Sequence, residues 1–484
     1  MPLLNELLSG IQVLDHWGDI HIPVNDLVIH ADKVKRGDLY IALPGARFDG
    51  HDYIDRAIAN GAAAVLLQEP ERRNPGIVTL QVRDTRLALS ELAAAWYGYP
   101  TREITMTGVT GTNGKTTVCY LLRAMLQAGY RTGLLGTIEY KAGEELLGSG
   151  LTTPAPLDLH RLLRQMRDRQ VEQCVMEVTS HALVQHRVAG IDFKYAVFTN
   201  LTSEHLDYHG TMDQYLAAKL RLFHGLNDNA TAIINLDDKY AHAVMEAAKS
   251  AMVLTYGINS PRASIAAESL VANKRGTSMD VNTPIGRFPL QSGLHGRHNA
   301  SNILAAVAYG VATGMSLDAI AERIASFRAV PGRFEPVECG QPFPVIVDFC
   351  HTPDALTNTL YTIQDVYEKS LITVFGCGGD RDQEKRPQMG RIASTHSKRV
   401  IITNDNPRTE DPKQIIGQIE RGLTSGCKVH IIPDRREAIR TALSLAGPGD
   451  AVLIAGKGHE TWQEINGVRY PFDDRQVVRE YFGG

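Results

Sequence analysis

Short apolar runs alternate with helix-like segments along most of the chain. In the N-terminal part these runs read DLYIAL, AAAVLLQ and GIVTLQV, and the part ends at Tyr99 and Pro100. From Glu103 the order becomes strand, turn and helix, because ITMTGV leads into a glycine-rich turn and a predicted helix over residues 115–128, which Gly129 closes. Later runs read QCVMEV, YAVFTN and TAIINL. This alternation predicts a mainly parallel sheet with helices on both faces.

A second series of strands begins after the run VPGRFE, residues 330–335. The strands PVIVDF, LITVFG, RVIITN, KVHIIP and AVLIAG alternate with helical segments, and nearly all of them run directly into polar or glycine residues. In open α/β sheets, ligands bind beyond the carboxyl ends of the strands. We therefore expect Asp348, Gly376, Asp405 and Gly456 to lie along one ligand-binding edge.

Composition and charge restrict the class of protein. The 484 residues are 43% hydrophobic and 21% charged, without an apolar stretch of about 18 residues that could span a bilayer. The net charge of −4 comes from scattered charges, which argues against nucleic acid or membrane partners. The N-terminus lacks the features of a secretory signal, and the six cysteines form no CxxC pair. We expect a cytoplasmic monomer of several domains with reduced thiols.

The strongest local motif is GVTGTNGKTT, Gly108 to Thr117, which follows a strand and opens a helix. Its glycines let successive backbone N–H groups and the helix N-terminus face phosphate oxygens. Lys115 adds a positive charge near the terminal phosphates, and the Thr116 hydroxyl is suited to bind Mg²⁺. The motif is a variant of GxxxxGK[ST], because Val109 stands where the first glycine belongs. The alternative is a strand-to-helix turn that binds nothing.

Two further strand ends carry groups that can hold Mg²⁺. Glu177 ends QCVMEV, and a carboxylate there suits a hard ion that keeps most of its waters. The run FTNLTSEHLDYHG places His205, Asp207 and His209 at another strand end. Such histidines are often capping or structural residues, an alternative that stays open, but beside a phosphate loop we count His205 among the predicted metal ligands. In FGCGGDRD, Arg381 replaces the last glycine of GxGxxG, which argues against a dinucleotide site.

Six ordered motifs resemble those of the Mur ligase family. They are GTNGKTT (Gly111 to Thr117), MEVTSHALVQHR (Met176 to Arg187), NLTSEHLDYHGTMDQYLAAK (Asn200 to Lys219), GRHNASN (Gly296 to Asn302), VPGRFE and DFCHTPDAL (Asp348 to Leu356). The resemblance implies an α/β protein of three domains. A smaller N-terminal α/β domain, residues 1–99, would bind the UDP substrate. A central P-loop domain, 100–332, would bind ATP, and a Rossmann-like α/β domain, 333–484, would bind an amino acid.

Within the family, the motifs are most similar to those of ATP-dependent ligases of peptidoglycan precursor synthesis. These ligases add meso-diaminopimelate to the D-glutamate γ-carboxylate of a UDP-linked muramyl dipeptide through an acyl phosphate, with Mg²⁺. The resemblance also implies that CO₂ carbamylates Lys219, in the helical run DQYLAAKLRLF, and so makes it a ligand for Mg²⁺. Without the resemblance, a solvated helix lysine would be the expectation.

The resemblance assigns individual residues of this chain to sites. The implied ATP contacts are Gly111, Thr112, Asn113, Gly114, Lys115, Thr116, Thr117, Asn299, Asn302, Arg333 and His351. The implied contacts with the UDP-linked dipeptide are Ile29, Ala31, Ala46, Arg47, Phe48, Leu151, Thr152, Thr153, Thr179, Gln185 and Arg187. The implied catalytic residues are Lys115, Glu177, His205 and Lys219, and the implied Mg²⁺ ligands are Thr116, Glu177, His205 and Lys219. Ala31 departs from the family, which commonly has a serine there, although backbone groups can still bind uridine.

The run DNPR, Asp405 to Arg408, indicates which amino acid is added. Pro407 would fix the backbone so that Arg408 projects into the crevice, where a guanidinium binds a carboxylate through two parallel hydrogen bonds. Diaminopimelate is in effect lysine with one additional carboxylate, so Arg408 has an evident use; the alternative is a turn with a solvated arginine. The implied contacts with diaminopimelate are Arg381, Asp405, Asn406, Pro407, Arg408, Gly456 and Glu460.

Other functions use part of the same motifs. A phosphoryl transferase or simple NTPase could use the loop at Lys115, but it would release phosphate without any amino acid. The nearest alternative within the family is the lysine-adding ligase, against which the DNPR run argues. Ligases that add D-Ala-D-Ala and folylpolyglutamate synthases fit the remaining C-terminal motifs less well. A nucleotide-gated scaffold would need no polar residues collected at C-terminal strand ends.

Overall fold

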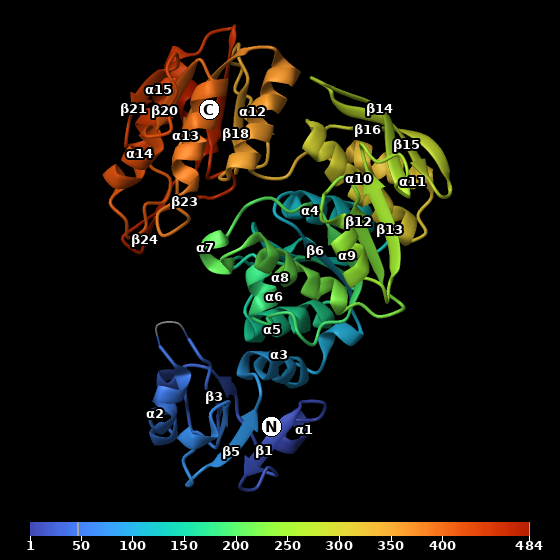
Figure 1. The fold of residues 1–484 in the computed structure, drawn as a ribbon, viewed down its shortest axis with the longest axis vertical. Helices are drawn as coiled ribbons and strands as arrows, with labels where there is room; N and C mark the ends of the chain where they lie inside the picture. The colour runs from blue at the N-terminus through green and yellow to red at the C-terminus, as the bar shows by residue number, and fades with distance from the viewer. Residues whose placement is uncertain (46–47, 484) are drawn as a thin grey trace. The chain divides into compact units, whose positions relative to one another are not determined.

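The computed structural model, drawn as a ribbon in Figure 1, describes residues 1–45 and 48–483. The chain divides into two compact units. One unit consists of Met1–Gly108 and Gly129–Tyr195, and the other of Val109–Ala128 and Ala196–Gly484. None of the helices in the described ranges has both the length and the apolar character needed to cross a lipid bilayer. Predicted contacts Ala46 and Arg47 lie outside the described residues.

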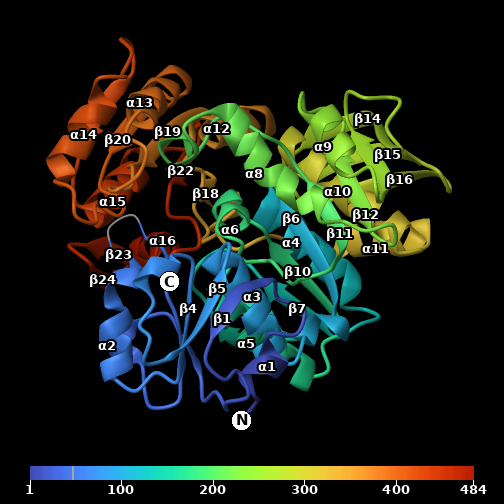
Figure 2. The ribbon, with the colours of Figure 1, turned by 60° about the horizontal axis from the view of Figure 1, so that its bottom comes forward.

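The first unit begins with a five-stranded sheet in which β3, β4 and β5 follow the predicted apolar runs, whereas β1 and β2 were not predicted. The spatial order is β1 (Val13–Trp17), β5 (Val78–Val82), β4 (Ala64–Leu67), β3 (Leu39–Ile41) and β2 (Leu27–Val28). Only β1 is antiparallel to its neighbour. Leu39 and Ile41 pack with residues of α1 (Leu4–Leu7) and α3 (Thr85–Trp96), whereas Tyr40 packs with α2 (Ile54–Ala59). Because successive side chains of a strand point to opposite faces, both faces are covered, as Figure 2 shows for α2 and α3.

The longest sheet has a parallel centre and antiparallel edges. Its order is β16 (Gly286–Ser292), β15 (Gly276–Thr283), β14 (Ile265–Asn273), β13 (Met252–Gly257), β12 (Thr231–Asn235), β11 (Phe193–Phe198), β6 (Thr105–Thr110), β10 (Gln173–Glu177), β7 (Thr132–Leu135), β8 (Tyr140–Ala142) and β9 (Glu145–Gly148). Strand pairs β10–β7, β12–β13 and β13–β14 are parallel, which confirms the prediction of a mainly parallel centre. The antiparallel pairings of β14 with β15, β15 with β16, β7 with β8 and β8 with β9 were not predicted.

The helices of this part include α4 (Lys115–Leu126), which begins where predicted and ends two residues earlier. The others are α5 (Pro156–Asp168), α6 (Ser180–Val184), α7 (Leu206–His209), α8 (Met212–His224), α9 (Ala241–Ala247), α10 (Arg297–Ala312) and α11 (Leu317–Ser326). In the second unit, α4 packs on α10 and α11.

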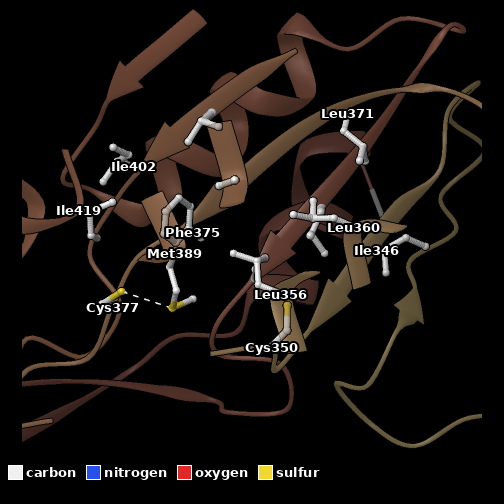
Figure 3. Close-up of a cluster of buried hydrophobic side chains, with 14 of the residues drawn as sticks. Ile346, Cys350, Leu356, Leu360, Leu371, Phe375, Cys377, Met389, Ile402 and Ile419 are labelled. Atoms are coloured by element: carbon white, nitrogen blue, oxygen red, sulfur yellow. Dashed lines mark hydrogen bonds between the residues drawn. The ribbon is translucent and has the colours of Figure 1, made fainter. Parts of the chain in front are cut away.

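The C-terminal sheet matches the strands predicted from the second series. Its order is β17 (Glu335–Pro336), β18 (Val345–Asp348), β22 (Asp450–Ala455), β19 (Ser370–Phe375), β20 (Arg399–Ile402) and β21 (Lys428–Ile431). All neighbours except β17 and β18 are parallel. One face is covered by α12 (Pro353–Tyr367), α13 (Lys385–His396) and α14 (Pro412–Glu420), and the other by α15 (Arg435–Leu445) and α16 (Asp474–Phe482). Figure 3 shows Leu356, Met389 and Ile419 of the first three helices in the core with Ile346 and Phe375.

A hairpin of β23 (Trp462–Ile465) and β24 (Val468–Pro471) follows the last strand of this sheet. Its turn residues Asn466 and Gly467 have φ angles of 49° and 76°, the positive values that a tight two-residue hairpin turn requires. The backbone N–H of Arg408 donates to Glu464 O at 3.1 Å, and Asn466 N–H donates to Arg408 O at 2.7 Å. The hairpin is therefore bonded to the DNPR segment, which itself follows β20.

The buried side chain of His160, in α5, makes the free energy of unfolding depend on pH. Burial lowers the pKa of His160 to about 4, below the value of about 6.5 expected in the unfolded chain. Between these values the unfolded chain binds more protons, so the stability contribution is complete above about pH 6.5 and is lost as pH falls towards 4. We expect the unfolding free energy to fall about 2 kcal/mol more from about pH 7.5 to about pH 5 in the unmutated protein than in His160→Leu.

Denaturant titrations at both pH values measure this difference, with His242→Leu, at an exposed position, as the matched control. An identical pH dependence of the unmutated protein and His160→Leu would contradict the assignment.

Candidate active site

The phosphate loop connects β6 to α4, and two of its glycines cannot carry a side chain. Gly111 has a φ of 150° and Gly114 a φ of 86°. A Cβ atom at Gly111 would lie 1.9 Å from Thr199 Oγ1, and one at Gly114 would lie 2.4 Å from Asn302 Oδ1. The predicted loop is thus formed with Asn302, a predicted ATP contact, directly against it. Asn302 also donates to Asn299 Oδ1 at 3.1 Å.

Two lysines share one carbonyl oxygen of this loop. Lys115 Nζ donates to Gly111 O at 3.0 Å and to Thr112 O at 2.8 Å, and Lys219 Nζ donates to Gly111 O at 2.8 Å. Lys219 is only 1% exposed. Burial and the positive charge of Lys115 hold the pKa of Lys219 well below its usual range, which favours a neutral amine.

A carboxylate that sequence analysis did not single out lies beside the predicted metal ligand His205. Glu204 Oε2 lies 3.8 Å from His205 Nε2, and Glu204 Oε1 lies 3.6 Å from His351 Nε2. Burial raises the pKa of Glu204, but the contact with His351 and nearby positive charge, including that of Lys115, outweigh it and hold that pKa below its usual range. Burial, with a smaller contribution from Lys115, lowers the pKa of His205 to about 4, so its imidazole is neutral at pH 7 and able to bind a cation.

Contacts within the second unit join the phosphate loop to segments that follow residue 330. Asn113 Nδ2 donates to Asp354 Oδ2 at 2.7 Å, at the start of α12. Arg333 donates to Thr116 Oγ1 at 3.2 Å, and its guanidinium lies 4.4 Å from the centre of the Phe349 ring. Together with the contact between His351 and Glu204, these bonds bring the predicted ATP-side residues together.

In the first unit, hydrogen bonds connect four of the residues predicted to contact the UDP-linked dipeptide. Thr153 Oγ1 donates to Glu177 O at 2.8 Å, and Thr179 N–H donates to Thr153 Oγ1 at 3.1 Å. Arg187 donates to Thr153 O at 2.9 Å and to Gln185 Oε1 at 2.8 Å.

The carboxylate of Glu177 is held in the same unit by Thr137. The backbone N–H of Thr137 donates to Glu177 Oε1 at 2.8 Å, and Thr137 Oγ1 donates to Glu177 Oε2 at 3.1 Å and lies 3.1 Å from Thr152 Oγ1. Glu177 is only 1% exposed. Thr152, another predicted dipeptide contact, is therefore connected to Glu177 through one threonine.

Two cavities of the first unit border the remaining predicted substrate residues. One, of about 640 Å³, is lined by Ile29 among others, and the second, of about 340 Å³, is lined by Leu151. Both cavities are bordered by Ala155 and Asp158 at the start of α5.

The two remaining described residues of the predicted uridine site lie outside the lining of these cavities. Phe48 is 73% exposed, and Ala31 is buried with its carbonyl accepting a hydrogen bond from Asn60 at 2.8 Å. The Ala31 carbonyl thus already has a protein partner.

One group of potential metal ligands lies elsewhere in the described chain, at Asp49, His51 and Glu69. His51 Nδ1 lies 2.7 Å from Asp49 Oδ1, and His51 Nε2 accepts the backbone N–H of Gln68 at 3.1 Å. Both ring nitrogens of His51 therefore already have protein partners.

Arg408 has an unusual backbone conformation, with a φ of 53° in the left-handed region. Its guanidinium donates to Gly379 O at 2.6 Å, and its Nε lies 3.8 Å from Glu464 Oε2. The side chain of Arg381 lies near that of Arg408. Partial desolvation and the positive charge of Arg408 lower the pKa of Arg381. Such a pair is suited to attract a carboxylate.

The other predicted amino-acid contacts meet around Asn406. Asn406 Nδ2 donates to Glu460 Oε2 at 2.9 Å, and Lys457 Nζ donates to Asn406 Oδ1 at 3.0 Å. A Cβ atom at Gly456 would lie 2.6 Å from Asp405 Oδ2. The structure therefore brings the DNPR and GKGHE runs to one edge of the C-terminal sheet, as predicted from their positions at strand ends.

Sequence reasoning missed three parts of this arrangement. Glu204 lies within the run NLTSEHLDYH, from which only the histidine at position 205 was predicted to bind a metal. Lys457 lies within GKGHE, where glycine and glutamate were considered alone. Glu464 belongs to the hairpin, which the sequence WQEI-NG-VRYP does indicate, because Asn-Gly between alternating residues is a strong hairpin signal.

Three known family models match most of the chain. The model described as "Mur ligase family, catalytic domain" matches residues 23–97, "Mur ligase middle domain" matches 109–310, and "Mur ligase, glutamate ligase domain" matches 332–458. Two similar proteins are named UDP-N-acetylmuramoyl-L-alanyl-D-glutamate--2,6-diaminopimelate ligase. The one from Geobacter metallireducens is 44% identical and aligns over 99% of this chain and 98% of its own length. The one from Bacillus velezensis is 42% identical over 98% of both chains.

Solved structures agree with this relationship. A structure of a ligase with the same name has a TM-score of 0.68 and 34% identity, and the match covers 95% of both chains. The MurF ligase of Thermotoga maritima in complex with ADP has a TM-score of 0.61 at 20% identity, over 95% of this chain and 97% of that one, and so shares the fold. With three family models in order and close relatives along the whole length, this chain belongs to the Mur ligase family.

Proposed function

We propose that the protein is an ATP-dependent ligase that joins 2,6-diaminopimelate to UDP-N-acetylmuramoyl-L-alanyl-D-glutamate. The names of its full-length relatives support this substrate pair. The observation that carries the proposal for this chain is the placement of Arg408. Its strained backbone and its proximity to Arg381 are features of a functional site that recognises a carboxylate.

The first step is activation of the D-glutamate γ-carboxylate. A carboxylate does not form an amide with an amine at neutral pH, because its oxygen is a poor leaving group. A carboxylate oxygen attacks the γ-phosphorus of ATP, the bond to the β,γ-bridging oxygen breaks, and an acyl phosphate and ADP form. Lys115 and the backbone N–H groups of the loop from Gly111 to Gly114 neutralise charge on the phosphates, which is most of the catalysis in phosphoryl transfer.

The groups around the loop fit a hard divalent cation such as Mg²⁺. The hydroxyl of Thr116 offers an oxygen ligand, and His205 is neutral at pH 7. Glu177 remains a predicted ligand. Bound Mg²⁺ would supply positive charge against the crowded phosphate oxygens.

We propose that Lys219 is carbamylated and so becomes an anionic oxygen ligand. Its amine is buried, and its depressed pKa favours the neutral form, which has the lone pair needed to attack CO₂. The product carries one negative charge and releases one proton. Buried next to Lys115, an anion is electrostatically preferred over a second ammonium group.

The second step joins the amino acid to the activated carboxyl. The neutral amine attacks the acyl carbon, a tetrahedral intermediate forms, and inorganic phosphate leaves with the amine proton passing to solvent. Arg408 binds the carboxylate at the far end of diaminopimelate, which lysine lacks. Glu460 is suited to accept hydrogen bonds from the ammonium group at the same end.

The proposal predicts that ADP release depends on both the UDP-dipeptide and one particular amino acid. In a screen of single amino acids we expect meso-diaminopimelate to stimulate ADP release and lysine to be a poor substitute. With ¹⁸O in the dipeptide γ-carboxylate, one labelled oxygen is expected in the released phosphate. Phosphate release without any amino acid would instead indicate a simple NTPase, and unlabelled phosphate would eliminate the acyl phosphate.

A further inference from the structure

We infer that Lys457 is a positioning residue that, directly and through the buried Asn406, orients Glu460 to receive the incoming amino acid. The inference rests on the proposed function, in which Glu460 contacts diaminopimelate. Lys457 itself has no exposed surface, so it acts through its neighbours.

The three polar side chains form a closed triangle of hydrogen bonds. Lys457 Nζ donates to Glu460 Oε2 at 2.8 Å and to Asn406 Oδ1 at 3.0 Å. Asn406 Nδ2 donates to the same Glu460 Oε2 at 2.9 Å. Each side chain is therefore held by the other two, and rotation of any one would break two bonds.

The triangle also fixes the orientation of the Asn406 amide. Asn406 Oδ1 accepts a second hydrogen bond, from the backbone N–H of Glu464 at 3.0 Å. The ring of Trp462 lies with its centre 5.4 Å from Lys457 Nζ. The hairpin thus packs beside the ammonium group and contributes one bond to the network.

The arrangement leaves one oxygen of Glu460 for a ligand. Oε2 is occupied by Lys457 and Asn406, whereas Oε1 makes no hydrogen bond to any residue in the described ranges. The Glu460 side chain is 17% exposed, against 0% for Lys457. A carboxylate anchored by one oxygen and open at the other suits the ammonium group of an amino-acid zwitterion.

A purely structural account is the main competitor. A buried ammonium needs compensating partners, so Lys457 and Glu460 could be paired only to stabilise the fold. The two accounts differ in which kinetic constant changes when Lys457 is replaced. Positioning predicts a selective rise in the KM for the amino acid, whereas loss of stability alone lowers the amount of active enzyme.

The test uses steady-state kinetics of the full chain with ATP, UDP-dipeptide and meso-diaminopimelate. For Lys457→Met, which keeps the length of the side chain, we expect the KM for diaminopimelate to rise about 10- to 100-fold, as for the loss of a hydrogen bond to a charged group. The KM values for ATP and UDP-dipeptide should stay within about twofold. In a Glu460→Gln background the same change should add less than about threefold, because Lys457 acts through Glu460.

Two control variants separate positioning from stability. Lys413→Met makes the same change at an exposed site of α14 and should leave all constants unaltered. Ile439→Ala removes a fully buried side chain of α15 and should lower the melting temperature without altering the KM for diaminopimelate.

An unchanged KM for diaminopimelate in Lys457→Met, with a lowered melting temperature, overturns the inference. If that variant is insoluble, Lys457→Gln replaces it, with an expected rise of about three- to tenfold, and an unchanged KM again overturns the inference. If the unmutated protein releases no ADP with diaminopimelate, the proposed function itself fails, which is a distinct outcome.

Discussion

Replacing Lys219 with alanine is expected to lower the rate of amide formation about 10²- to 10³-fold, comparable to removing one group that stabilises transition-state charge. The reason is the loss of the anionic ligand that carbamylation would create from a buried, neutral amine beside the phosphate loop. Bicarbonate should restore none of the activity, whereas a small carboxylic acid such as formate should restore part of it. The rate of ADP release with all substrates present measures the effect.

The carbamate also has a readout that does not depend on turnover. Enzyme equilibrated with ¹³CO₂ should give a carbamate carbon signal in ¹³C NMR that is missing from Lys219→Ala. Lys249→Ala, at a side chain that is 75% exposed, is the matched control and should keep both the signal and the activity. Full turnover of Lys219→Ala would remove the carbamate from the mechanism.

The second large effect is expected at Arg408. For Arg408→Ala, kcat/KM for diaminopimelate should fall about thirtyfold to several thousandfold, since truncating a buried charged contact costs about 2–5 kcal/mol. The preference for diaminopimelate over lysine should largely disappear, because the guanidinium is the group proposed to bind the extra carboxylate. Competition between the two amino acids, followed by mass spectrometry of the products, measures this preference.

Arg391→Ala provides the control, because Arg391 is an exposed arginine on α13 of the same C-terminal part. It should leave kcat/KM and the preference unaltered. Equal use of lysine and diaminopimelate by the unmutated protein would refute the role of Arg408.

Local pattern was sufficient to predict the elements that carry the site. The strands that lead to Glu177 and Asp405 contain continuous apolar runs, typical of strands buried on both faces. The strand before Gly111 includes threonines, and the glycine-rich turn after it indicated its end. The polar ends of these strands follow from the geometry of parallel sheets, so the ligand-binding edges could be predicted as well. The antiparallel edge strands β14 to β16 were missed because they are long, partly exposed and rich in polar residues.

The long-range contacts of the site could not be derived from local pattern. The pairing of Glu204 with His351 joins residues that are far apart in the sequence, and neither residue shows it in its own surroundings. The burial of Lys219 is equally hidden, since its helical run reads as an ordinary amphipathic segment. Its predicted role came only from the family resemblance. The three domain boundaries and the roles of the individual site residues remain predictions.

The left-handed backbone conformation of Arg408 lowers the stability of the fold at a residue that is proposed to recognise the substrate. A residue with a Cβ atom in this conformation is disfavoured by about 1–2 kcal/mol, a penalty that glycine would not incur. Glycine at position 408 would remove this penalty, but it would also lose the hydrogen bond to Gly379 O and the group proposed to bind the second carboxylate. A thermostable variant should therefore obtain its added stability from other positions, while Asp405 to Arg408 are kept unchanged.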